Sequence, residues 1–201
     1  APAYGAGVAE KMIGKALAGG LPRESLVIAT KAGFVVRDGR RQIDTSRGAL
    51  LNDLESSLRR LRTDHVDLWQ VHAWGDAPIE ETLSAMDAAV ARGMARYVGV
   101  SNFVGWQTAT AATWQEADRT RTRLSSVQVE YSLLARRAEV EVVGAAAYHQ
   151  LGLLAWSSLG RGVLPGSYRG GRLPRGSRGA SEHFTWFVEP YLQPRSAAIV
   201  D

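Results

Sequence analysis

Short apolar runs alternate along the chain with segments of helical periodicity. The apolar runs predict buried strands at 25–31, 67–72, 95–101, 125–131 and 152–157. Between them, the periodicity predicts helices at 8–18, 50–61, 79–92, 105–117 and 138–149. The second helix is the clearest, because Leu50, Leu54, Leu58 and Leu61 fall on one of its faces. Strands that alternate with helices indicate a parallel sheet covered by helices.

The spacing of these strands favours a (β/α)8 TIM barrel. Their carboxyl ends recur at intervals of 26 to 41 residues, which suits a barrel repeat. A doubly wound open sheet is the alternative, but its glycine fingerprint follows none of the strands. The 201 residues fall short of the roughly 250 of a typical barrel, and five strands are visible. We therefore expect one α/β domain over 1–201, a barrel incompletely represented in this chain.

Composition and charge narrow the functional classes. The chain has no Cys, which excludes a disulfide scaffold, a thiolate metal site and a cysteine nucleophile. No apolar run approaches the roughly 18 residues of a membrane span, and the lack of a targeting signal favours a cytoplasmic protein. The net charge of +4 is local, because residues 142–181 hold five Arg and no Asp or Glu. This pattern suits a phosphate-bearing small ligand rather than nucleic acid or a membrane, and it leaves the oligomeric state open.

The segment after the last expected strand differs from the rest of the chain. Residues 160–179 hold seven Gly and the five Arg. A flexible surface loop is the simple interpretation. Because the Arg excess is concentrated there, we favour a loop over 160–181 that folds across a ligand at the barrel mouth. The tail at 196–201 indicates the first turns of a helix that is cut short.

Polar side chains stand at the carboxyl ends of the expected strands, where barrel enzymes build their active sites. They are Lys31, His72, Ser101 with Asn102, Gln128 and Ser157. Taken alone, Lys31 could extend its ammonium to solvent, and His72 could be a hydrogen-bonded core residue. Together with Tyr4 they form a proton-donating set, because a nearby ammonium lowers the pKa of a tyrosine.

Four motifs resemble the aldo-keto reductase family and occur in that family's order. The segment DHVDL at 64–68, after a helix that carries LxxSLxRL, is similar to the family's helix-to-strand signature. GVSNF at 99–103 resembles a second signature. Residues 4–14 resemble the stretch around the family's catalytic tyrosine, and WSSLGRGVL at 156–164 resembles its loop over the cofactor pyrophosphate. The resemblance extends from residue 1 to about 170.

The resemblance implies a TIM barrel that reduces an aldehyde or ketone with NADPH and without a metal. By matching position, Tyr4 would protonate the carbonyl oxygen as the general acid. Lys31 would lower the pKa of Tyr4, and His72 would orient the carbonyl and help relay the proton.

The resemblance also implies a cofactor site. Ser101, Asn102 and Gln128 would hold the nicotinamide carboxamide, while Tyr131 would stack on the ring. The residues that would surround the pyrophosphate are Trp156, Ser157, Leu159, Gly160, Arg161, Gly162 and Leu164. Trp74 is either a wall of the substrate pocket or an anchor of its own loop.

Three further expectations follow. The family places a catalytic Asp at a position before Ala1 and additional barrel units outside this chain, so we expect a fragment of a longer reductase that is inactive alone. One alternative function is a non-catalytic, cofactor-binding regulatory subunit, as some family relatives such as potassium-channel β subunits are. A weaker alternative is a Schiff-base enzyme that uses Lys31.

Overall fold

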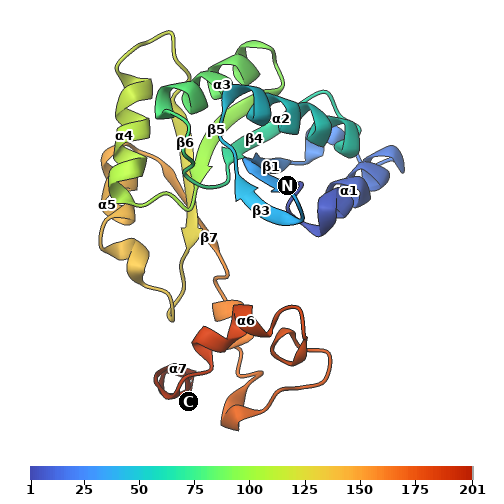
Figure 1. Cartoon of the computed structure of the whole chain (residues 1–201), viewed down its shortest axis with the longest axis vertical. Coiled ribbons are helices and arrows are strands. Elements are labelled where there is room, and N and C mark those ends of the chain that lie inside the picture. Colours follow the sequence, from blue (N-terminus) through green and yellow to red (C-terminus); the bar gives the residue numbers. More distant parts are fainter. Residues whose placement is uncertain (201) are drawn as a thin grey trace.

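A five-stranded parallel sheet with helices along one face forms the main body of the computed structural model, which describes residues 1–200 (Figure 1). The strands pair in chain order: β1 (Ala29–Ala32), β4 (Val66–Val71), β5 (Ala95–Ser101), β6 (Leu124–Glu130) and β7 (Gly152–Trp156). The helices are α1 (Val8–Ala18), α2 (Arg47–Leu61), α3 (Ile79–Ala91), α4 (Gly105–Glu116) and α5 (Val142–Tyr148). The predicted alternation of strands and helices is therefore confirmed.

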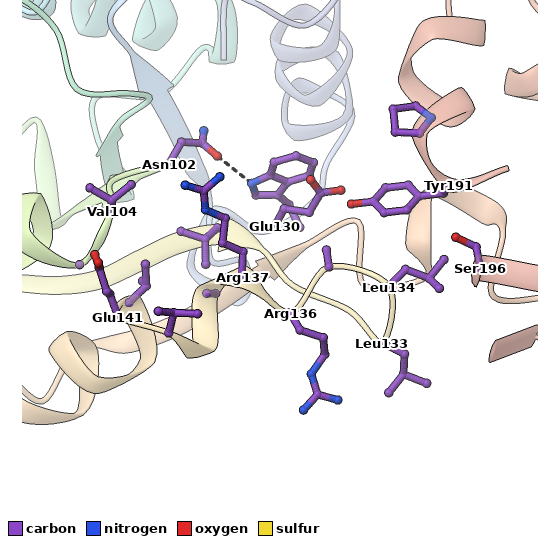
Figure 2. Close-up of a pocket in the computed structure, with 18 of the residues that line it drawn as sticks. Asn102, Val104, Glu130, Leu133, Leu134, Arg136, Arg137, Glu141, Tyr191 and Ser196 are labelled. Carbon is purple, nitrogen blue, oxygen red and sulfur yellow. Dashed lines mark hydrogen bonds between the residues drawn. The ribbon is translucent and has the colours of Figure 1, made fainter. Parts of the chain in front are cut away.

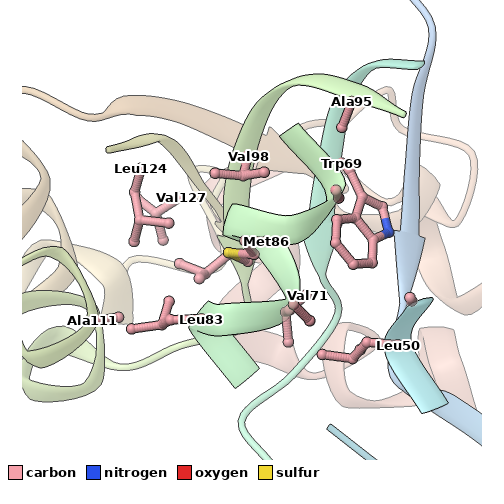
Figure 3. Close-up of a cluster of buried hydrophobic side chains, with 14 of the residues drawn as sticks. Leu50, Trp69, Val71, Leu83, Met86, Ala95, Val98, Ala111, Leu124 and Val127 are labelled. Atoms are coloured by element: carbon pink, nitrogen blue, oxygen red, sulfur yellow. The ribbon is translucent and has the colours of Figure 1, made fainter. Parts of the chain in front are cut away.

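The core lies between the sheet and these helices (Figure 3). Successive strand residues point to opposite faces. Trp69 and Val71 of β4 and Val98 of β5 are fully buried against the helices. The four leucines expected on one face of α2 are all buried, with exposed fractions between 0 and 8%. Burial of this apolar stripe fixes α2 against the sheet, as the sequence pattern predicts.

The opposite face of the sheet is the one that points inward in a barrel. Strand register places Lys31, Gln70 and Gly99 in one row and Ser101, Gln128 and Leu154 in the next. The two outer strands, β1 and β7, are not paired with each other, so the curved sheet does not close. Leu154, which is 37% exposed, lies on this open face.

Two features near β1 differ from the expected elements. The strand begins at Ala29 instead of residue 25, because the guanidinium of Arg23 donates to the backbone oxygen of Leu26 at 2.8 Å and holds a turn there. Val27 is consequently 85% exposed. The chain then forms an unpredicted antiparallel hairpin from β2 (Phe34–Arg37) and β3 (Arg40–Ile43).

The turn of this hairpin explains why it forms. Asp38 and Gly39 have φ values of +51° and +71°, as a two-residue type I′ turn requires. Asp-Gly is a preferred sequence for that turn. The dipeptide is therefore the sequence signal that could have revealed the hairpin.

Residues 157–200 form a lobe beyond the end of β7 (Figure 1). Its regular elements are short 3-10 turns and the helices α6 (Thr185–Val188) and α7 (Pro194–Val200). Val163, Tyr168 and Val188 form a small core of their own. The expected terminal helix is present as α7, while Asp201 lies outside the described residues. Over residues 1–200, no helix has the length and apolar character needed to cross a membrane.

Candidate active site

Tyr4, Lys31 and His72 meet at the carboxyl ends of β1 and β4. His72 directly follows β4, where its backbone N–H donates to the oxygen of Ala32 at 2.9 Å. The Tyr4 ring meets the His72 ring edge-on, with 5.9 Å between centroids. The Nζ atom of Lys31 lies 5.8 Å from the centroid of Tyr4. The sequence-predicted catalytic set is thus brought together from three separate segments.

Burial controls the protonation of this set. It lowers the pKa of His72 to about 3, and the positive charges of Lys31 and Arg41 act in the same direction. Burial also lowers the pKa of Lys31. The imidazole of His72 is therefore neutral near pH 7 and presents one N–H donor and one acceptor nitrogen.

The pKa of Tyr4 is shifted in the opposite direction from the one expected for a tyrosine beside the Lys31 ammonium. Burial raises the pKa of Tyr4, and the charge that opposes this effect belongs to Arg41 instead of Lys31. Arg41 comes from the hairpin, which the sequence analysis missed. Its guanidinium carbon lies 3.8 Å from the centroid of the Phe34 ring, and that ring meets His72 edge-on at 4.5 Å.

Asn102 ties together the ends of four strands. Its backbone N–H donates to the oxygen of Gln128 at 2.8 Å. Its side-chain amide donates to the oxygen of His72 at 2.9 Å and to Ser101 Oγ at 3.2 Å. The amide oxygen accepts from Trp156 Nε1 at 2.9 Å (Figure 2). The backbone of Asn102 has φ of +57°, a conformation that asparagine tolerates better than most residues.

The polar groups that remain available suit a primary amide such as the nicotinamide carboxamide. The Ser101 hydroxyl can still donate, and the Asn102 amide oxygen retains one lone pair. The Gln128 side chain, which shares the inward row with Ser101, supplies both a donor and an acceptor. Hydrogen-bond donors and acceptors are thus present together at these strand ends, so this set of residues fits a nicotinamide carboxamide.

In the expected pyrophosphate loop, backbone N–H groups form hydrogen bonds within the loop. The N–H groups of Gly160 and Gly162 donate to the oxygens of Ser157 and Leu159, at 2.8 and 3.1 Å. The N–H of Leu164 also donates to the oxygen of Leu159. Phosphate binding by these amides would require the turns to open.

Arg161 is engaged within the protein. Its guanidinium forms two hydrogen bonds to the carboxylate of Glu130, at 2.7 and 2.6 Å. It also donates to the oxygen of Phe187 at 2.6 Å and lies over that ring, with 4.1 Å to the centroid. In this form Arg161 joins the C-terminal lobe to β6, and its charge is balanced by Glu130 and not free for a phosphate.

Tyr131 and Trp74 also have defined partners. The Tyr131 hydroxyl donates to Glu139 at 2.6 Å, so its polar end is held on the connection that follows β6. Trp74 packs against Phe103 and Trp106, with centroids 5.2 Å away in both cases. Trp74 is both an anchor of its loop and the wall of a small groove that Phe34 and Arg41 also line.

A larger cavity of about 860 Å³ lies between the connection after β6 and the C-terminal lobe (Figure 2). Asn102, Glu130 and Trp156 line its inner side, and Tyr191 and Ser196 line its outer side. The cavity therefore borders the candidate cofactor residues. Among residues 1–200, no group of three or more His, Cys, Asp or Glu side chains is arranged to hold a metal ion.

The sequence matches the model of the Aldo/keto reductase family over residues 1–189. The chain belongs to the aldo/keto reductase family. The holo form of aldo-keto reductase AKR11C1 from Bacillus halodurans has a TM-score of 0.70 and 30% identity, over 87% of this chain and 55% of that chain. The open sheet is therefore an incompletely represented TIM barrel, and the family is one of oxidoreductases.

Two curated relatives of this chain differ in their described role. The uncharacterized oxidoreductase YrpG of Bacillus subtilis (strain 168) is 41% identical over an alignment of 168 residues, which covers 80% of this chain and 51% of YrpG. A probable voltage-gated potassium channel subunit beta of Arabidopsis thaliana is 36% identical over 188 residues, 92% of this chain and 56% of that protein. The chain thus spans about half the length of these relatives.

Proposed function

We propose that the complete polypeptide carrying this sequence reduces an aldehyde or ketone to an alcohol with NADPH. The observation that carries the proposal is the meeting of Tyr4, Lys31 and His72 at the carboxyl end of the sheet. The bound nicotinamide supplies the hydride, and the protein supplies orientation and a proton.

Each member of the set has a physical role. Tyr4 is 49% exposed, so its hydroxyl can reach a carbonyl oxygen and donate a proton to it. The neutral imidazole of His72 can donate a hydrogen bond to the same oxygen and so orient the carbonyl. Lys31, whose Nζ atom lies 5.8 Å from the centroid of the Tyr4 ring, would hold that ring in place, whereas the charge that favours the ionised tyrosine is that of Arg41.

The cofactor would be held at the neighbouring strand ends. Ser101, Asn102 and Gln128 would bind the carboxamide, and Tyr131 would stack on the ring. Residues 157–164 would surround the pyrophosphate after their turns open. Arg161 would exchange Glu130 for a phosphate. The choice of NADPH and a cytoplasmic location rest on the family resemblance and on the sequence.

The test uses the complete polypeptide, because this chain spans about half of its relatives. We expect the protein to oxidise NADPH when an aromatic aldehyde is added, and the loss of NADPH fluorescence measures the rate. Replacement of the general acid in Tyr4→Phe should lower kcat by at least roughly 100-fold while leaving NADPH binding intact. Tyr148→Phe is the matched control, because Tyr148 is 84% exposed and remote from the site. Retained turnover in Tyr4→Phe would contradict the assigned role.

A regulatory subunit that binds the cofactor without useful turnover is the second candidate. Similarity to the potassium channel subunit beta of Arabidopsis thaliana favours it. The same assay separates the two functions. Tight NADPH binding by the wild-type protein without reduction of any aldehyde would support the regulatory role.

A further inference from the structure

A groove of about 510 Å³ opens beside the proposed catalytic set, between the hairpin and the loop that follows His72. The Phe34 ring and the Trp74 indole line it, together with the charged side chains of Arg41 and Asp76. Phe34 also meets His72 edge-on, so the groove reaches the residue that would orient the carbonyl. A substrate bound at His72 can therefore extend into this groove, along the rings of Phe34 and Trp74.

Arg41 is an accessible cation on this groove. Its side chain is exposed, and its guanidinium lies over the Phe34 ring at 3.8 Å. Among residues 1–200, no carboxylate lies within ion-pair distance of Arg41. Asp44, which directly follows the hairpin, is paired with Arg37. Arg41 thus offers an unsatisfied planar donor array, which matches a carboxylate well.

The stacking fixes the guanidinium near the reacting groups. A guanidinium held over an aromatic face keeps its edge N–H groups free for an anion. The Phe34 ring beneath Arg41 meets the His72 ring edge-on, with 4.5 Å between the centroids. The guanidinium therefore lies near the residue that would orient the carbonyl, where it can contact another group on the same substrate.

We propose that Arg41 binds a carboxylate on the carbonyl substrate, so that the enzyme prefers acidic aldehydes whose apolar spacer packs between Phe34 and Trp74. This inference rests on the proposed reductase function and specifies its substrate class.

The test compares two aldehydes of similar size in the complete polypeptide. They are para-carboxybenzaldehyde, which is charged, and para-methylbenzaldehyde, which is neutral. For Arg41→Gln, we expect kcat/KM with the charged aldehyde to fall roughly tenfold, through KM, because one charge-assisted contact is lost. Because the Arg41 charge also acts on Tyr4, kcat/KM with the neutral aldehyde should fall by a clearly smaller factor, and Arg41→Lys should restore part of the preference.

Arg40→Gln is the matched control. Arg40 is the adjacent residue of β3, is exposed, and points to the opposite side of the hairpin. This substitution should leave kcat/KM unchanged for both aldehydes. The proposal is overturned if Arg41→Gln slows both aldehydes equally, which would indicate an effect on the catalytic groups. It is also overturned if Arg40→Gln matches Arg41→Gln, which would indicate general charge attraction.

A binding measurement keeps this inference separate from the proposed activity. Trp74 lines the groove, so its fluorescence should be quenched when para-toluate, a carboxylate without an aldehyde, binds. Trp74→Phe identifies the part of the signal that comes from this indole. Roughly tenfold weaker quenching in Arg41→Gln supports the site even without turnover. Equal affinity in the two proteins overturns it, whereas turnover of the neutral aldehyde shows that the reductase function stands.

Discussion

Acid should destabilise the fold through His72. This side chain is 7% exposed, and burial lowers its pKa from 6.5 to about 3. The unfolded chain takes up a proton near pH 6.5, whereas the folded protein does not until about pH 3. The stability associated with the neutral imidazole is thus complete above pH 6.5 and is lost as the pH falls toward 3. Within this window the free energy of unfolding falls by about 1.4 kcal/mol per pH unit. Lowering the pH from 8 to 5 therefore lowers it by about 2 kcal/mol.

The assay isolates this contribution by comparing wild type with His72→Gln. The free energy of unfolding is measured by urea denaturation at pH 8 and at pH 5 in the complete polypeptide. The variant should lose about 2 kcal/mol less than wild type over this range, because it has no imidazole to protonate. His183→Gln is the control, since His183 is exposed and should leave the pH dependence unchanged.

Proton NMR provides a direct check of the same reasoning. The ring signal of His72 should not titrate between pH 8 and pH 5. A midpoint near the ordinary pKa, or parallel stability curves for wild type and His72→Gln, would refute the burial argument.

Three further predictions concern packing. A Cβ at Gly14 would collide with the backbone of α2, so Gly14→Ala should lower the free energy of unfolding by about 1–3 kcal/mol, whereas Gly144→Ala, in open space on α5, should not lower it. Leu54 is fully buried, and urea denaturation of Leu54→Ala should show a loss of about 2–5 kcal/mol; a smaller loss would mean that the core collapses into the gap. Arg161→Gln removes the bidentate contact with Glu130, so limited proteolysis should cut residues 157–200 faster than in wild type, and unchanged cleavage would show that the apolar contacts suffice.

The sequence predicted the alternating body well because its signal is local. Strands β4 to β7 lie within one or two residues of the apolar runs that predicted them. Leu50 and Leu54 lie on the buried face of α2, as the helical period requires. The start of β1 was misplaced because the turn before it depends on Arg23, whose partners His65 and Asp67 are distant in sequence.

The candidate catalytic set was predictable for a topological reason. Carboxyl ends of neighbouring parallel strands meet at one edge, so Lys31 and His72 had to approach each other. Arg41 was not predicted, because it belongs to the Asp38-Gly39 hairpin and not to the repeating strand and helix units. The pairing of Arg161 with Glu130 could not be predicted, because it depends on where the C-terminal lobe packs.

The sequence by itself determined the repeating strand and helix units, the buried faces and the residues gathered at the strand ends. These follow from periodicity, which each segment carries independently of the rest. Only the tertiary structure decided which charges are satisfied and which remain available. It balanced Arg161 with Glu130, held Asn102 between four strands and left Arg41 exposed above Phe34. Such pairings depend on distances between segments far apart in the chain, because an ion pair or a hydrogen bond forms only within a few ångströms.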